Sequence, residues 1–262
     1  MTLVWKPGYS FDSDASTYID AVETADGQAL ETGVRVAIND FVLGCKQDEI
    51  WDAIKASCIL AGARTLSGAL VPLVKQPADS APARFGTEGG WNYNRETGLQ
   101  GNGTDNYINS GRNNNAESDQ DNNHNAVYAT SLQATNTVLM AAADPATAAG
   151  AGGNALFTLG ASRCRANAAS TIPVTPPAPG LLGFSRSIGS QYTLRYSGQN
   201  NTIAIASDGL LSQNVLVYRR QSSAPSYTTS RLAFYSIGES LDLAALDTRV
   251  SNLITAIGAA IP

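Results

Sequence analysis

The chain of 262 residues is 43% hydrophobic and only 15% charged, with a net charge of −5 and an isoelectric point near 4.9. This length suits one large β-sandwich, or a sandwich joined to a small helical domain. The acidic balance gives no electrostatic footprint for a phosphate backbone, so DNA or RNA binding is not expected.

The first part of the chain, residues 13 to about 62, has apolar residues at helical spacing. One helix is predicted from Ser13 to Asp26, a second ends at Gly44, and a third runs from Asp48 to Gly62. Three short helices make a bundle that is too small to be stable alone. We expect it to dock on the rest of the fold or on a partner subunit.

A proline-rich stretch follows and indicates a linker rather than a periodic element. The sequence therefore predicts three regions: residues 1–75 as a helical attachment or oligomerisation region, residues 76–90 as a linker, and residues 91–262 as the main domain.

Residues 91–262 are typical of a β-sandwich, because short alternating segments are separated by turn residues. The segments near residues 91–94, 107–108, 126–130, 191–196, 201–206 and 214–219 are predicted strands. The Asn- and Asp-rich residues 109–125 are predicted to form a surface loop, with His124 exposed beside it.

The C-terminal stretch predicts a strand covered on both faces, because both sets of alternating residues in 231–237 are apolar. Gly238 should end that strand and Asp242 should cap a closing helix. Apolar residues then recur at helical spacing up to Ile257.

The three cysteines, Cys45, Cys58 and Cys164, are odd in number and lack framework spacing, which argues against a disulfide-stapled secreted domain. Cys45 and Cys58 are predicted core residues. The N-terminus has no apolar signal-peptide core, and no apolar run reaches membrane-span length. We therefore expect a protein made in a cytoplasm, without membrane insertion.

Two segments resemble concanavalin A-like, laminin-G-like jelly rolls. In the C-terminal one, Arg231, Tyr235, Ile237 and Leu241 stand at places comparable with the last strand of such domains. The other is the glycine-punctuated segment from Gly98 to Ile108. The resemblance implies a mainly β fold: a concanavalin A-like jelly-roll β-sandwich with a small N-terminal helical bundle and a C-terminal closing helix.

The chemistry-bearing residues give little support for catalysis. His124 is the one histidine, and no nucleophile-elbow sequence or zinc-ligand spacing is present. Glu117, Asp119 and Asp121 are similar to the E-x-D-x-E strand of concanavalin A-like glucanases, but their neighbours are not apolar strand formers. The same three acids offer oxygen ligands for Ca²⁺ or form a solvated turn, and no other cofactor is expected.

Carbohydrate binding needs aromatic platforms and planar polar groups that pair with hydroxyls. The sequence offers both between residues 91 and 114, although each aromatic residue could instead pack in the core. The candidate residues are Trp91, Tyr93, Asn94, Tyr107, Asn113 and Asn114.

Taken whole, the chain resembles proteins of tailed phages and prophages that join a short helical region to a concanavalin A-like lectin domain. Four stretches carry the resemblance: residues 26–31, 59–70, 93–99 and 231–242. It implies a non-enzymatic structural protein of the virion, in a tail fibre or baseplate. Its expected partners are other virion proteins, further copies of itself and a host surface glycan.

Two alternatives remain. One is a capsid decoration protein, and the other is a glycan-degrading enzyme of the same fold that uses Glu117 and Asp121.

Overall fold

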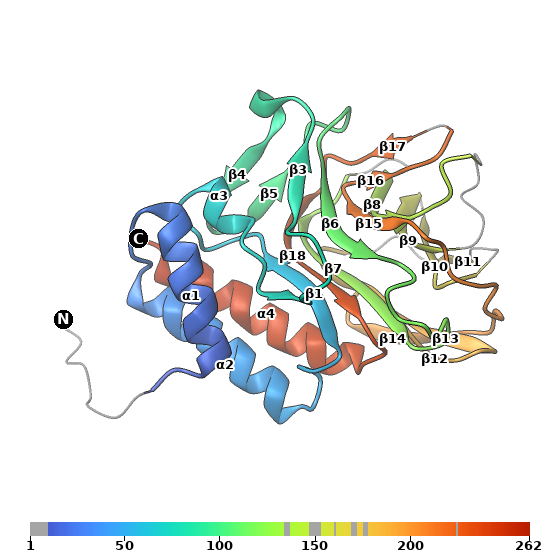
Figure 1. Ribbon diagram of the computed structural model, residues 1–262, viewed down its shortest axis with the longest axis horizontal. Helices are drawn as coiled ribbons and strands as arrows, with labels where there is room; N and C mark the ends of the chain where they lie inside the picture. The colour runs from blue at the N-terminus through green and yellow to red at the C-terminus, as the bar shows by residue number, and fades with distance from the viewer. Residues whose placement is uncertain are drawn as a thin grey trace.

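The computed structural model describes residues 10–133, 137–146, 153–159, 161–168, 172–174, 178–223 and 225–262. Within these segments, two large sheets face each other and helices cover the outer face of one of them (Figure 1). Every strand pair formed by the described residues is antiparallel. The predicted fold class, a mainly β jelly-roll sandwich with N-terminal helices and a closing helix, is confirmed.

The helix-covered sheet has nine strands in the order β14-β13-β12-β7-β18-β1-β2, with β5 pairing to β18 and β4 to β5. The central strand β18 lies between β7 and β1, and it is buried on both faces as predicted. The strands are β1 (Ile54–Ile59), β2 (Val74–Lys75), β4 (Asn92–Asn94), β5 (Gly98–Gln100), β7 (Asn123–Ser131), β12 (Gly180–Ile188), β13 (Gln191–Tyr196), β14 (Gln199–Ile203) and β18 (Arg231–Gly238).

The second sheet has seven strands in the order β11-β10-β9-β8-β15-β6-β3. A two-stranded hairpin, β16 (Arg219–Arg220) with β17 (Ser226–Tyr227), lies beside β8 of this sheet (Figure 1). The strands are β3 (Ala83–Phe85), β6 (Tyr107–Asn113), β8 (Thr137–Ala142), β9 (Asn154–Leu159), β10 (Ala161–Arg165), β11 (Ile172–Val174) and β15 (Asn214–Val217).

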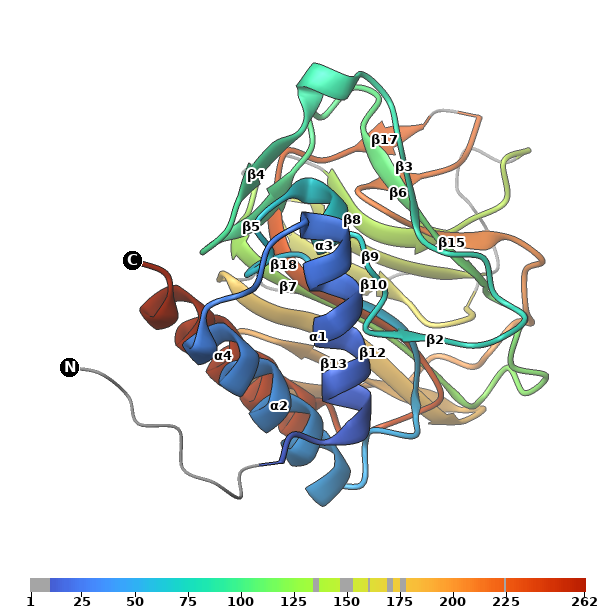
Figure 2. The ribbon, with the colours of Figure 1, turned by 60° about the vertical axis from the view of Figure 1, so that its left-hand side comes forward.

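The helices are α1 (Ser13–Asp26), α2 (Thr32–Gln47), a single turn α3 (Leu66–Ala69), a 3₁₀ turn η1 (Glu88–Gly90) and the closing helix α4 (Leu243–Ala260). Helices α2 and α4 lie side by side across the nine-stranded sheet (Figure 2). They run antiparallel, because Gly33 meets Ala260 at one end and Gly44 meets Arg249 at the other. The Asp242 carboxylate accepts hydrogen bonds from the backbone of Ala244 and Ala245, which confirms the predicted cap.

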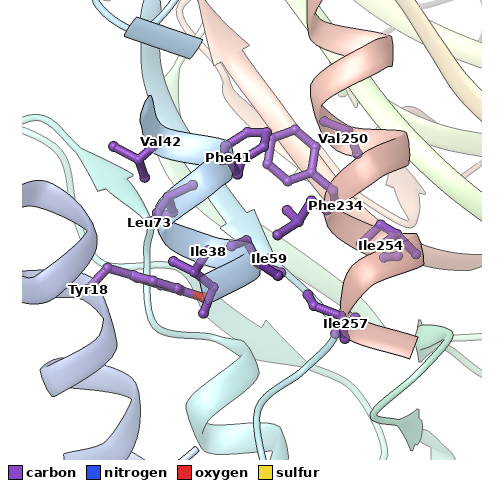
Figure 3. Close-up of a cluster of buried hydrophobic side chains, with 14 of the residues drawn as sticks. Tyr18, Ile38, Phe41, Val42, Ile59, Leu73, Phe234, Val250, Ile254 and Ile257 are labelled. Carbon is purple, nitrogen blue, oxygen red and sulfur yellow. The ribbon is translucent and has the colours of Figure 1, made fainter. Parts of the chain in front are cut away.

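The core between helices and sheet forms around β18, where an irregularity between Leu232 and Phe234 puts both Ala233 and Phe234 on the helix side. Phe234 points toward the helices and meets the Phe41 ring edge-on, with 5.6 Å between centroids and 63° between planes (Figure 3). Side chains from α1, α2, α4 and β1 complete this cluster: Tyr18, Ile38, Val42, Ile59, Val250, Ile254 and Ile257.

A second core lies between the two sheets, and the next residue of β18, Tyr235, points into it. Val127, Phe184 and Val217 reach the same space from β7, β12 and β15. Cys45, Cys58 and Cys164 are free and buried, which confirms the core prediction for the first two. Burial raises the pKa of the Cys45 and Cys58 thiols to about 12.

The predicted third helix, Asp48 to Gly62, is wrong. Residues 54–59 form β1, which is hydrogen-bonded to β18 on one side and β2 on the other. A short apolar run that is buried on both faces has no periodicity to separate helix from strand, so pairing with neighbouring strands decides. The predicted stop at Gly44 is also wrong, because α2 continues to Gln47.

The expected boundaries near residues 75 and 90 do not separate the strands of one region from those of another. Strands β1 and β2 fall within residues 1–75, yet they belong to the nine-stranded sheet, and β3, within residues 76–90, pairs with β6. The N-terminal helices and the sandwich therefore share one core.

The predicted surface loop at residues 109–125 is wrong at both ends. Asn109 to Asn113 continue β6, and Asn123 to Asn125 open β7. His124, predicted to be exposed, is fully buried between strands. Both ring nitrogens of His124 have hydrogen-bond partners, the Glu239 carbonyl and the Ser236 hydroxyl, so this polar residue can be buried in spite of its polar surroundings in the sequence.

Candidate functional site

The outer face of the seven-stranded sheet carries a band of polar side chains along β6. Alternation in this strand buries Ile108, Ser110 and Arg112 against the sandwich interior and leaves Tyr107, Asn109 and Asn113 half-exposed on the other side. The neighbouring strand β15 presents Asn214 and Leu216 to the same face, opposite Asn113 and Asn109. This face is the candidate site.

An open depression of about 280 Å³ lies on this face, and its lining is largely amide and hydroxyl. The lining residues are Tyr107, Asn109, Asn113, Ser212, Gln213, Asn214, Leu216 and Gln221. The Asn214 amide donates to the Asn109 side-chain oxygen at 3.1 Å, and that oxygen also accepts from the Gly111 backbone at 3.0 Å. These bonds hold the side chains of Asn109 and Asn214 in fixed orientations on their strands.

A column of aromatic and cationic side chains borders the depression. Phe85, on the edge strand β3, stacks on Tyr107 with centroids 4.9 Å apart and planes 10° from parallel. The Arg219 guanidinium carbon lies 4.5 Å from the Tyr107 ring centre and 5.4 Å from that of Tyr227. Phe85 is 43% exposed, so the column ends in an aromatic ring open to solvent.

Trp91, Tyr93 and Asn94, predicted to bind carbohydrate, have structural contacts elsewhere. Trp91 meets the buried Tyr218 edge-on, with centroids 5.5 Å apart. The Tyr93 hydroxyl donates to the Ala63 carbonyl at 2.7 Å, and burial raises the pKa of this hydroxyl. The Asn94 side chain accepts backbone hydrogen bonds from residues 96 and 97, which closes the turn between β4 and β5.

Asn114, another predicted carbohydrate ligand, is buried in a chain of asparagines. Its side chain donates to the Asn167 oxygen at 3.1 Å and accepts from the Asn154 amide. The Asn167 amide in turn donates to the Gln120 carbonyl at 3.0 Å. Of the six candidates, the structure therefore brings Tyr107 and Asn113 together on the depression and places the other four away from it.

The acids predicted as weak metal ligands do not converge. Glu117 pairs with the buried Arg112, whose guanidinium also binds Asp79 at 2.7 Å. The Asp119 carboxylate accepts from the Asp121 backbone at 2.8 Å. Within the described residues, no three His, Cys, Asp or Glu side chains are grouped so that they could hold a metal ion.

These acids also lie outside any strand, because β6 ends at Asn113 and β7 begins at Asn123. The alternation that would point Glu117, Asp119 and Asp121 into one cleft is therefore missing. Asp121 lies instead near Arg186, whose charged form it favours.

Sequence reasoning missed Phe85, Asn109, Arg219 and Gln221. Phe85 stands in the proline-rich stretch, where no alternation marks a strand, and its pairing with β6 arises only in the folded sheet. Arg219 carried one signal, its place at the end of the predicted strand near residue 219, but nothing in the sequence brings it to Tyr107.

No protein-family model matches the chain, and no curated protein matches it by sequence. Solved structures give distant likenesses. The Ruminococcus gnavus IT-sialidase CBM40 matches with a TM-score of 0.39 and 12% identity, over 49% of this chain and 83% of that one. A mutant Trypanosoma rangeli sialidase displaying trans-sialidase activity matches with a TM-score of 0.46 and 12% identity, over 84% of this chain and 39% of that one.

The NanB sialidase of Streptococcus pneumoniae matches with a TM-score of 0.38 and 10% identity, over 49% of this chain and 24% of that one. All three TM-scores are below 0.5, so the fold assignment rests on the sheet order and strand pairing themselves. None of these proteins assigns a function to this chain. In the described part of the chain, no helix is long and apolar enough to cross a membrane.

Proposed function

We propose that this protein is a non-enzymatic glycan-binding protein and that it binds through the outer face of the seven-stranded sheet. One observation carries the proposal: an open depression with an amide and hydroxyl lining lies directly beside the Phe85–Tyr107 stack. Planar amides donate to and accept from sugar hydroxyls, while an exposed ring packs against the apolar face of a sugar.

The geometry suits this chemistry better than it suits a small apolar ligand. Amide side chains from β6, β15 and Gln221 line a shallow space, and Phe85 provides a flat ring at its border. Apart from Gln221, these groups lie on strands, so binding a sugar orders few additional side chains and loses little entropy.

The biological setting in our proposal is the virion of a tailed phage, in a tail fibre or baseplate, with the chain assembled with further copies of itself and with other virion proteins. Support comes from the sequence resemblance, above all residues 26–31 and 231–242. Residues 26–31 join α1 to α2, and residues 231–242 form β18 and the turn into α4. Capsid decoration is the alternative position, and imaging the particle with the subunit traced separates the two.

The absence of catalysis is part of the proposal. A glycan-degrading enzyme of this fold would need Glu117 and Asp121 to act as a pair of carboxylates. Glu117 is instead ion-paired with Arg112, and both acids lie in the loop between β6 and β7. Polysaccharide cleavage that is abolished by Glu117→Ala and Asp121→Ala would overturn it.

The binding test is a glycan array with the full-length protein, followed by titration of the strongest ligand. Phe85→Ala should weaken binding about fivefold, since a stacked exposed ring contributes roughly 1 kcal/mol. Ile188→Ala is the matched control: Ile188 is 48% exposed but lies on β12 of the other sheet. An array without any ligand, or equal losses in both variants, would remove this assignment.

A further inference from the structure

Arginines gather on the face that carries the depression. Residues paired across strands share a face, and one row of pairs runs from Asn109 through Leu216, Ala141 and Ala155 to Arg165. Arg165 therefore lies on the same face as the amides of the depression, at the far end of a row whose three middle residues are buried.

The β16–β17 hairpin adds two more arginines, and it lies beside β8 and β15 of this sheet. Arg219 packs over Tyr107, which lines the depression, and the next residue but one, Gln221, lines it too. Arg220 is near Arg165: burial lowers the pKa of both guanidinium groups, and the Arg220 charge lowers that of Arg165 further.

Arg219 has cation–π contacts in place of an acid partner. No carboxylate among the described residues forms an ion pair with it. By contrast, Arg35, Arg112 and Arg249 are each bound to carboxylates. A guanidinium of this kind beside an open polar depression is suited to an oxyanion from outside the chain.

We propose that the glycan taken by this face is acidic, and that Arg219 receives its anionic group at the Tyr107 end of the depression. This inference rests on the proposed glycan-binding function and names its ligand class. A chain with a net charge of −5 otherwise repels acidic polymers, so Arg219 must supply a local attraction.

A carboxylate, as in uronic or sialic acids, and a sulfate ester offer the same oxyanion chemistry to a guanidinium. Matched probe pairs separate these sources. The first pair is oligogalacturonate with its methyl ester, the second is 3′-sialyllactose with its methyl ester, and the third is dextran sulfate with dextran. Each acidic probe differs from its partner in the charged group.

The experiment titrates the full-length protein with all three pairs at low and at moderate salt. We expect at least one acidic probe to bind about tenfold or more tightly than its neutral partner, with a difference that shrinks as salt increases. Arg219→Gln should reduce acidic binding to the neutral level. Arg219→Lys keeps the charge but not the forked guanidinium, so it should lose less affinity for the acidic probes. Lys55→Gln removes a cation from the other sheet, so it should change the affinity for neither the acidic nor the neutral probes.

The outcomes separate the two proposals. Equal binding of acidic and neutral probes, or an Arg219→Gln protein that keeps its acidic preference while remaining folded, overturns the acidic ligand and leaves glycan binding intact. A preference within the sulfate pair alone supports the inference and assigns the site to sulfated glycans. If no probe binds and the array is also empty, both proposals are wrong.

Discussion

The imidazole Nε2 of His124 lies 2.7 Å from the Ser236 hydroxyl oxygen, and both residues are fully buried between β7 and β18. The other ring nitrogen, Nδ1, lies 2.5 Å from the Glu239 carbonyl oxygen, which can only accept. Nδ1 therefore carries the proton, and Nε2 accepts from Ser236. This pair has the spacing of a nucleophile and base, but neither side chain reaches solvent, so its role is structural.

The burial of His124 predicts that the free energy of unfolding decreases with falling pH at pH values well above those at which carboxylates become protonated. Burial lowers the pKa of His124 to about 4 from an unfolded value near 6.5. Between these values the unfolded chain binds the extra proton, so the free energy of unfolding decreases as pH falls from 6.5 to 4. The expected total loss is about 3 kcal/mol, measured by urea unfolding across that range.

The chain has one histidine, which makes the measurement specific. Asp12 and Glu31 have lowered pKa values, because Lys46 and Arg95 stabilise their carboxylates, so their contributions are lost only below about pH 4.5. His124→Gln should flatten the slope above pH 5, whatever it costs at neutral pH. A wild-type slope that survives this substitution would contradict the assignment.

Tyr93 should matter for stability and not for glycan binding. Its hydroxyl donates to the Ala63 carbonyl, which also accepts from Arg95 Nε at 3.0 Å, so Tyr93→Phe leaves that carbonyl satisfied. We expect a loss of about 1 kcal/mol in unfolding free energy and unchanged titrations with any array ligand. If Tyr93→Phe weakened glycan binding without changing the free energy of unfolding, Tyr93 would be a ligand-binding residue after all.

Much of the fold was predictable, because it depends on local patterns. The Ser13–Asp26 helix, the strand at 231–238 and the Asp242 cap each follow from apolar spacing and a terminal residue within a few positions. The jelly-roll class followed from the number of short strands and from the resemblance of the last one.

The site was less predictable, because its members meet only through long-range pairing. Tyr107 and Asn113 are two residues of one strand, and alternation alone puts them on one face. Phe85 and Arg219 come from segments 134 positions apart, and no local pattern joins them. His124 and Asn114 were misjudged because composition describes polarity, whereas burial depends on whether hydrogen-bond partners exist.

Gly98 should be intolerant of substitution. It has φ +100° at the start of β5, and an added Cβ would collide with the backbone carbonyl of Leu232 on the neighbouring strand. Gly98→Ala should therefore cost about 3 kcal/mol or more. Gly198, with φ +73° in the turn between β13 and β14, has no atom within 4 Å of the added Cβ. Gly198→Ala should cost only about 1 kcal/mol, and equal midpoints in urea would refute the steric argument.

Phe234 should be the residue that couples the helices to the sandwich. It is fully buried under α2 and α4, so Phe234→Ala should cost about 3–5 kcal/mol, while Phe85→Ala on the exposed edge should stay below about 1 kcal/mol. Because the Phe41 ring meets Phe234 edge-on, a double-mutant cycle should show a coupling of about 0.5–1.5 kcal/mol. Zero coupling, or a Phe234→Ala protein whose helices unfold separately from its sheets, would show that the two layers do not share one core.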